Sequence, residues 1–239
     1  MSTLAIVPAR AGSKGVPGKN VRHLAGRTLL DYAATAARES GVIDRIILTT
    51  DSAEIAEIGR SAGLDVPFLR PSALAQDDTP MLPVVRHALD YVVADGWTPQ
   101  FVVLLQPTSP LRRPEHIQQA LAILRESGAD SVVSVVEVPK HLSPDYVMRI
   151  DGGLLRPFLP EGVLVTRRQD VRPAYCRDGT VYAFRRDVLE RFDSIYGEDC
   201  RPLVVDEGDS LSIDSPADWA AAERILSSRA RTPATDGST

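Results

Sequence analysis

The chain has 239 residues, of which 44% are hydrophobic and 5% aromatic, and its formal net charge is -5. This length and composition predict one globular domain with a sizeable core. An acidic chain without a long run of Lys and Arg is not expected to bind nucleic acid or an anionic membrane surface. No apolar segment approaches the length of a membrane-spanning helix, so we expect a cytoplasmic protein.

Short apolar runs alternate with amphipathic helical patterns along the first part of the chain. The run at 4–7 predicts a strand, and Thr28 with Asp31 forms a capping box that opens a helix. Further strands are expected at 45–51, 101–110 and 131–138, with helical patterns around 55–62, 85–92 and 117–124. Strands that are apolar on both faces and separated by such helices predict a doubly wound, mostly parallel α/β sheet.

The alternation stops between residues 139 and 177, where prolines and glycines interrupt every periodic pattern. An insert of this length is expected to line a site or to meet a partner. Strands are expected again at 179–184 and 201–206, and Ser215 with Asp218 opens a last helix. We therefore expect one domain over residues 1–228 and a disordered tail at 229–239.

The two cysteines show neither the spacing of a metal site nor that of a redox pair. Cys176 and Cys200 are therefore expected to be buried, reduced thiols.

The loop after the first strand is basic although the whole chain is acidic. Residues 1–30 contain no Asp or Glu but five cations, namely Arg10, Lys14, Lys19, Arg22 and Arg27. Loops that leave the carboxyl ends of parallel strands commonly bind phosphates, and three cations in one such loop fit a triphosphate. A solvated loop is the alternative, but glycines that allow close approach and the lack of acids to pair with favour an anion site.

Two common phosphate-binding motifs are absent from this loop. Gly12 and Gly18 are six positions apart and Lys19 is followed by Asn20, which does not fit a Walker A motif. Lys14 stands where the dinucleotide fingerprint needs its second glycine.

Four ordered motifs resemble those of the cytidylyltransferases that activate acidic sugars, above all the acylneuraminate cytidylyltransferases. They are "VPARAGSKGVPGKN", "DRIILTTD", "RPSALAQDD" and "LLQPTSPLR", and the similarity extends over about residues 4–226. The resemblance implies a Rossmann-like nucleotidyltransferase fold. It also implies transfer of CMP from CTP to the anomeric hydroxyl of a 2-keto-3-deoxy sugar acid, with release of pyrophosphate.

The resemblance and the basic loop together give a candidate nucleotide site. Three cations are expected to clamp the triphosphate and to stabilise charge in the reaction: Arg10, Lys14 and Lys19. The expected nucleotide contacts also include Gly12, Ser13, Asn20, Arg70 and Gln106.

A divalent metal, Mg²⁺, is expected beside the phosphates, and it needs carboxylate ligands. The family motif Asp-Ile-Asp reads Ser212-Ile213-Asp214 here, so one of its two carboxylates is replaced. Asp214 is the expected ligand, and Asp209 is the candidate second carboxylate.

The resemblance also indicates which residues hold the acidic sugar. They are Gln106, Arg168, Gln169, Tyr175 and Tyr182, and Lys140 is a further candidate outside the matched motifs. Arg168 is the expected reader of the sugar carboxylate, because a guanidinium binds a carboxylate through two parallel hydrogen bonds. Asp178 stands where the family has Asn, which suggests a sugar different from sialic acid.

Members of this family are commonly dimers in which an inserted segment reaches the neighbour's site, so a homodimer is expected. Two other functions remain open. One is a cytidylyltransferase for another acid, such as Kdo or a phosphonate. The other is a catalytically silent nucleotide-binding homologue, which Ser212 favours.

Overall fold

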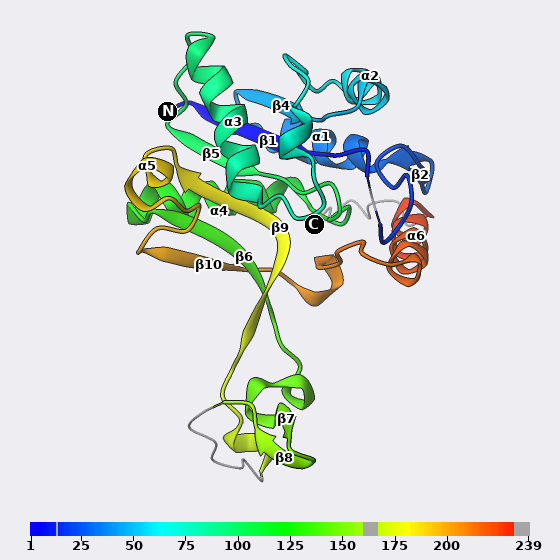
Figure 1. Ribbon diagram of the computed structural model, residues 1–239, viewed down its shortest axis with the longest axis vertical. Helices are drawn as coiled ribbons and strands as arrows, with labels where there is room; N and C mark the ends of the chain where they lie inside the picture. The colour runs from blue at the N-terminus through cyan, green and yellow to red at the C-terminus, as the bar shows by residue number, and fades with distance from the viewer. Residues whose placement is uncertain (13, 160–166, 232–239) are drawn as a thin grey trace, which may run out of the picture.

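A six-stranded sheet forms the body of the protein in the computed structural model, which describes residues 1–12, 14–159 and 167–231 (Figure 1). The strand order is β10-β6-β9-β5-β1-β4. The strands are β1 (Thr3–Pro8), β4 (Arg45–Thr49), β5 (Phe101–Leu104), β6 (Ser131–Glu137), β9 (Tyr175–Arg185) and β10 (Cys200–Val204). β9 is antiparallel to its neighbours β5 and β6, and the other pairs are parallel. The predicted, mostly parallel α/β sheet is confirmed.

Helices cover both faces of this sheet. They are α1 (Leu29–Glu39), α2 (Ala53–Ser61), α3 (Met81–Ala94), α4 (Pro114–Ser127), α5 (Val188–Phe192) and α6 (Pro216–Arg231). A small hairpin, β2 (His23–Leu24) and β3 (Arg27–Thr28), precedes α1. Single 3-10 turns lie at η1 (Ser72–Leu74), η2 (Lys140–Leu142), η3 (Pro144–Tyr146), η4 (Arg168–Asp170) and η5 (Glu207–Asp209).

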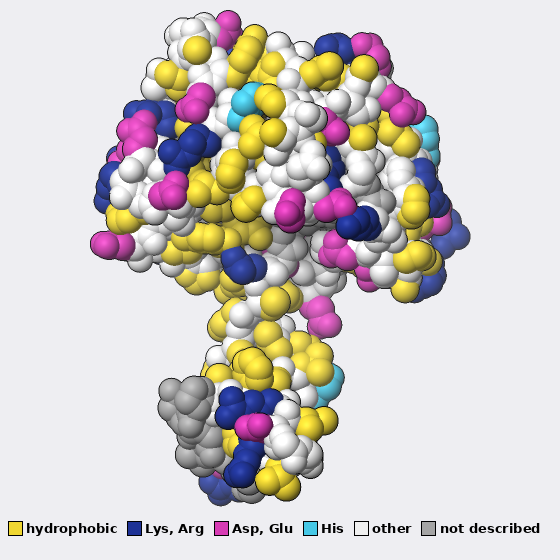
Figure 2. Space-filling view, in the orientation of Figure 1, with side chains coloured by type: hydrophobic (Ala, Val, Ile, Leu, Met, Phe, Trp, Pro, Cys, Tyr) yellow, Lys and Arg dark blue, Asp and Glu magenta, His cyan; other side chains and the backbone are white. Residues whose placement is uncertain are grey.

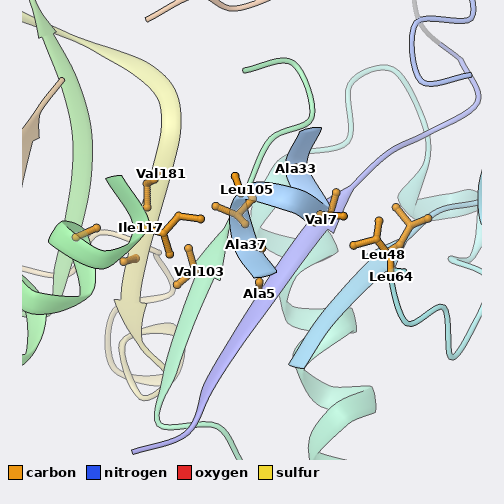
Figure 3. Packing of buried hydrophobic residues seen from close by; sticks show 14 of the residues in the cluster. Ala5, Val7, Ala33, Ala37, Leu48, Leu64, Val103, Leu105, Ile117 and Val181 are labelled. Atoms are coloured by element: carbon orange, nitrogen blue, oxygen red, sulfur yellow. The ribbon is translucent and has the colours of Figure 1, made fainter. Parts of the chain in front are cut away.

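The alternation of side chains along β1 divides the core between the two faces. Ala5 and Val7 belong to a cluster with α1, α2 and α4, part of which Figure 3 shows. Leu4 and Ile6 belong to a second cluster with α3. All four side chains are buried, as expected for a strand covered on both faces.

Two predicted capping boxes are present at helix starts. The Thr28 hydroxyl accepts from the Asp31 N–H at 3.1 Å, and the Asp31 carboxylate accepts from the Thr28 N–H at 2.8 Å. Ser215 and Asp218 make the same exchange at α6, with distances of 3.3 and 2.7 Å. Local hydrogen bonds, which the sequence pattern predicts, therefore define both helix starts.

An arm leaves the body where β6 and β9 extend beyond the sheet as a two-stranded ribbon (Figure 1). The expected insert at 139–177 is more regular than its prolines and glycines indicate. Residues 175–177 belong to β9, and the arm carries a hairpin of β7 (Met148–Asp151) and β8 (Leu154–Pro157). The sequence pattern predicts no strands at β7 and β8. Their apolar side chains face solvent, so they do not show the pattern of core strands.

The prediction that the two cysteines are buried is wrong. Both thiols are free and exposed, because Cys176 lies where β9 leaves the body and Cys200 begins the edge strand β10.

The last helix, α6, continues to Arg231, past the expected domain end at residue 228. Residues 232–239 of the expected tail lie outside the described residues. Among the helices that the structure describes, none is long and apolar enough to cross a membrane.

The capping box of α1 is open to a direct test. Thr28→Ala removes the hydroxyl that accepts from the Asp31 N–H, so the free energy of unfolding should fall by about 1 kcal/mol. Urea unfolding followed by circular dichroism measures this difference. Thr28→Ser keeps the hydroxyl and should remain closer to the wild type; equal losses in both variants would contradict a capping role.

Candidate active site

Two adjoining cavities lie at the carboxyl ends of β1 and β5. The first, of about 210 Å³, is lined by the end of β1 and the loop after it, the segment after β5, Arg70 and the start of α3, namely residues 8–10, 19–20, 70, 81 and 106–108. The second, of about 200 Å³, shares Arg10, Lys19 and Asn20 with the first and adds Gly12, Lys14, Gly15 and Asp214. β1 has β4 on one side and β5 on the other, and such a switch point is where open α/β sheets bind ligands.

Most of the residues predicted to bind nucleotide meet in these cavities. The first is lined by Arg10, Lys19, Asn20, Arg70 and Gln106, and the second by Gly12 and Lys14. Ser13 lies outside the described residues. The structure thus brings the cations of the loop together with residues from 50 to 100 positions away in the chain.

The loop after β1 is held in shape by its own backbone and by the end of β4. The Asn20 side-chain amide donates to the Arg10 carbonyl at 3.0 Å, and Asn20 is buried. The Ala9 N–H donates to the Thr49 carbonyl at 3.0 Å, and the Ala11 N–H donates to Asp51 at 3.1 Å. Asn20 therefore shapes the loop that carries Arg10.

The same loop packs on the segment before α6. A side chain at Gly15 would place its Cβ 2.0 Å from the Asp214 carbonyl oxygen, so only glycine fits there. Lys19 donates from Nζ to the Ile213 carbonyl at 3.0 Å, and its Nζ lies 4.0 Å from Asp214 Oδ1. Burial lowers the pKa of Lys19, which the charge of Asp214 opposes. Asp214 thus reaches the cavity through contacts with the basic loop.

Arg10 and Lys14 share one carboxylate that the sequence analysis did not single out. Arg10 Nη1 lies 2.6 Å from Asp77 Oδ1, and Lys14 Nζ lies 2.5 Å from Asp77 Oδ2. The hydrogen bonds from Lys14 and then from Arg10 lower the pKa of Asp77. The one sequence feature that points to Asp77 is its position at the end of the motif "RPSALAQD".

Arg70 is a buried cation, only 6% exposed, that lines the first cavity. Its guanidinium donates to the carbonyls of Thr49 at 3.3 Å and Leu74 at 3.4 Å. Its Nε has no hydrogen-bond partner in the part of the chain that the structure describes. Burial lowers the pKa of Arg70, and the carboxylate of Asp51 opposes this shift. A charge kept in this position is available to a ligand in the cavity.

Gln106 is held in place by Arg112, a second residue that the sequence analysis left without a role. Arg112 is buried and donates to the carbonyls of Gln106 at 2.6 Å and Thr180 at 2.5 Å. Burial lowers the pKa of Arg112 to about 10, and the charge of Asp178 opposes this shift. Gly179, with φ of +80°, lets β9 approach so closely that a Cβ there would lie 3.3 Å from Gln106 Oε1. Its position in "LLQPTSPLR" was the only signal for Arg112.

Asp209 does not lie with Asp214. Its two carboxylate oxygens pair with Arg229 at 2.7 Å and with Arg113 at 2.5 Å, and His116 Nε2 lies 3.5 Å away. Asp209 is buried between α4, η5 and α6, and the two more exposed arginines neutralise both of its oxygens. Among the described residues, no three His, Cys, Asp or Glu side chains are grouped so as to hold a metal ion.

The other acceptor candidates do not line either cavity in the described part of this chain. Arg168 and Gln169 lie in η4 on the arm, and Tyr175 is exposed where β9 enters the arm. Lys140 lines a separate cavity of about 340 Å³ at the base of the arm, with Glu137, Asp206 and Glu207. Tyr182 is buried in the core.

The carboxylate of Asp178 accepts from the Thr180 N–H at 3.1 Å and from its hydroxyl at 2.5 Å.

Comparisons with known proteins agree with this arrangement. A family model described as cytidylyltransferase matches residues 4–203. The CMP-N,N'-diacetyllegionaminic acid synthase of Legionella pneumophila is 37% identical, over 95% of this chain and 97% of that protein. The N-acylneuraminate cytidylyltransferase of Streptococcus agalactiae serotype III is 31% identical, over 92% of this chain and 52% of that protein.

Solved structures show the same fold at lower identity. CMP:2-keto-3-deoxy-manno-octonic acid synthetase complexed with CTP has a TM-score of 0.72 at 15% identity, covering 96% of this chain and 100% of that chain. A 4-diphosphocytidyl-2C-methyl-D-erythritol synthase from Anaerococcus prevotii has a TM-score of 0.63 at 18% identity, covering 95% and 98%. Since the family model spans most of the sequence and the Legionella relative matches nearly its whole length, the chain belongs to the cytidylyltransferase family.

Proposed function

We propose that the protein transfers CMP from CTP to the anomeric hydroxyl of a nonulosonic acid and releases pyrophosphate. The relatives named above as legionaminic acid and acylneuraminate enzymes support this substrate class. The observation that carries the proposal is the pair of adjoining cavities, which unite the cations Arg10, Lys14 and Lys19 with Asp214. This combination suits a polyphosphate with a divalent metal.

The proposed reaction is a substitution at the α-phosphorus of CTP. The anomeric oxygen forms a bond to this phosphorus and its proton passes to water, while the bond to the bridging oxygen breaks and pyrophosphate leaves with the electron pair. Negative charge grows on the leaving group, and fixed cations nearby stabilise that charge. Lys19 is already held by Ile213 and partly desolvated, so little reorganisation is needed for it to act.

Arg70 and Gln106 are proposed to position the nucleoside. Both line the first cavity and not the second, which Lys14 and Asp214 line. The guanidinium of Arg70 donates to the Thr49 and Leu74 carbonyls, so its positive charge stays in the wall of this cavity. Arg112 donates to the Gln106 carbonyl, which holds the backbone of this residue in the cavity wall.

Asp214 is the residue that we propose to hold Mg²⁺. Magnesium commonly binds through one or two carboxylates together with substrate phosphates, and Asp214 lines the cavity that also holds Arg10, Lys14 and Lys19. A bound ion there would neutralise charge on the phosphates. Asp209 is not proposed as a ligand, because Arg113 and Arg229 neutralise both of its oxygens.

A homodimer is proposed because the arm exposes an apolar face. Met148, Ile150, Leu155 and Pro157 share one face of the hairpin, and Ile150 and Leu155 are 80% and 69% exposed. Figure 2 shows hydrophobic side chains over this part of the arm. A two-stranded hairpin with such a face is expected to need a partner surface. In the proposed dimer, the arm carries the η4 segment, with Arg168 and Gln169, toward the neighbour's acceptor site.

Kdo or a phosphonate as acceptor, and a silent nucleotide-binding homologue, are the other candidates. The Asp178 carboxylate bonds to Thr180 in its own turn, so its departure from the family residue does not by itself exclude a nonulosonic acid. The cytoplasmic location remains a prediction from the sequence.

The proposed activity is tested by incubating the protein with each of the four nucleoside triphosphates, Mg²⁺ and a panel of sugar acids. Pyrophosphate release should require CTP and a nonulosonic acid. Lys19→Ala serves as the matched variant and should raise the CTP concentration needed for half-maximal rate, because it removes a phosphate-facing cation. Absence of pyrophosphate with every acceptor would favour the silent homologue.

The role of Asp214 predicts a separation of binding from turnover. Asp214→Asn should lower kcat by at least about tenfold, which corresponds to about 1.4 kcal/mol in the barrier, while CTP binding changes much less. Isothermal titration calorimetry and pyrophosphate release measure the two quantities. Asp206→Asn, which removes an exposed acid outside both cavities, should keep its kcat. Unchanged turnover in Asp214→Asn would remove this carboxylate from the mechanism.

The proposed dimer predicts the effect of charge on the hairpin. Ile150→Asp together with Leu155→Asp should give a monomer in analytical ultracentrifugation, because two carboxylates would be buried without partners. The monomer should still bind CTP but should lose turnover with the sugar acid. Val93→Asp places the same charge at an exposed apolar position on the body and should leave the dimer intact. A dimer that survives the double change would contradict this interface.

A further inference from the structure

Asp77 bridges Arg10 and Lys14, two cations that line the second cavity. One carboxylate oxygen pairs with Arg10 and the other with Lys14, at 2.6 and 2.5 Å. Arg10 Nη1 also contacts the Ala75 carbonyl at 3.4 Å. The bridging carboxylate therefore occupies these cations much as two oxygens of a bound anion would.

The contact also joins two parts of the site that are distant in sequence. The segment that carries Asp77 starts at Arg70 and ends at Met81, and both of these residues line the first cavity. Lys14 lies in the basic loop and lines the second cavity. Asp77 thus ties this segment to the basic loop.

A phosphate that binds Arg10 and Lys14 competes with this carboxylate for the positive charge of both side chains. We propose that Asp77 is an internal counter-ion of the nucleotide site, which a polyphosphate displaces from Arg10 and Lys14 on binding. This inference deepens the proposed function and rests on it. Its consequence is selectivity, because a ligand must carry enough charge to replace the carboxylate on two cations at once. The counter-ion re-forms its pairs when pyrophosphate leaves, which favours product release.

The effect on affinity should be modest, because the pairs are partly in water. The side chains of Lys14 and Asp77 are 78% and 46% exposed, and exposed ion pairs contribute little individually. Removing the competing charge should therefore tighten polyphosphate binding by about two- to tenfold at low ionic strength. The difference should shrink in high salt, where exposed charges are screened.

The test compares Asp77→Asn with Asp78→Asn in the full chain. Asp78 is the next residue, is also exposed and forms no ion pair with any other residue that the structure describes, so it controls for the loss of one negative charge. Binding of inorganic tripolyphosphate and of CTP is measured by titration calorimetry at low and high salt. Asp77→Asn should bind both ligands more tightly than the wild type, and Asp78→Asn should differ from it by less than about twofold. Asp77→Glu keeps a carboxylate and should stay near the wild type.

Weaker or unchanged binding of tripolyphosphate by Asp77→Asn overturns the proposal, as does an equal gain in both Asn variants. Absence of tripolyphosphate binding to the wild type also overturns it, since nothing would then displace the carboxylate. Tripolyphosphate carries no cytidine, so its result is independent of cytidylyl transfer. If it behaves as expected while no acceptor gives turnover with CTP, the proposed function fails and the counter-ion stands.

Discussion

The contact between Gly15 and the backbone of Asp214 is the constraint on which the site depends. These residues are separated by most of the chain, and a Cβ on residue 15 would lie 2.0 Å from the Asp214 carbonyl oxygen. The approach lets Lys19 reach the Ile213 carbonyl and brings the Asp214 carboxylate beside the basic loop. Without it, the cations would line an open surface and the carboxylate would stand apart from them.

Charge balance explains why the basic loop can form before any ligand binds. The first 30 residues contain no acid, so their cations must find counter-charges elsewhere in the fold. Asp77 supplies one for Arg10 and Lys14, and Asp214 lies near Lys19. Two other buried arginines, Arg70 and Arg112, rely on backbone carbonyls instead. The site is therefore an assembly of cations that pair either with exposed carboxylates or with backbone carbonyls.

The arm separates the proposed nucleotide-binding residues from the proposed acceptor-binding residues in space. The two cavities lie on the body, whereas Arg168 and Gln169 lie in η4 on the arm. The extension of β6 and β9 out of the sheet produces this separation, as Figure 1 shows. The exposed apolar face of the hairpin on the same arm then gives a physical reason for a second copy of the chain to complete the site.

Local patterns in the sequence determined the elements that depend on neighbouring residues. The alternation of apolar strands and amphipathic helices, the capping box at Thr28 and the basic loop were all readable, because each rests on contacts within a few positions. Tertiary structure alone decided which carboxylate meets which cation: Asp209 pairs with Arg113 and Arg229, while Asp77 bridges Arg10 and Lys14. It also decided that the cysteines are exposed and that the arm is a ribbon. These outcomes depend on how distant segments approach in space, which spacing along the chain does not encode.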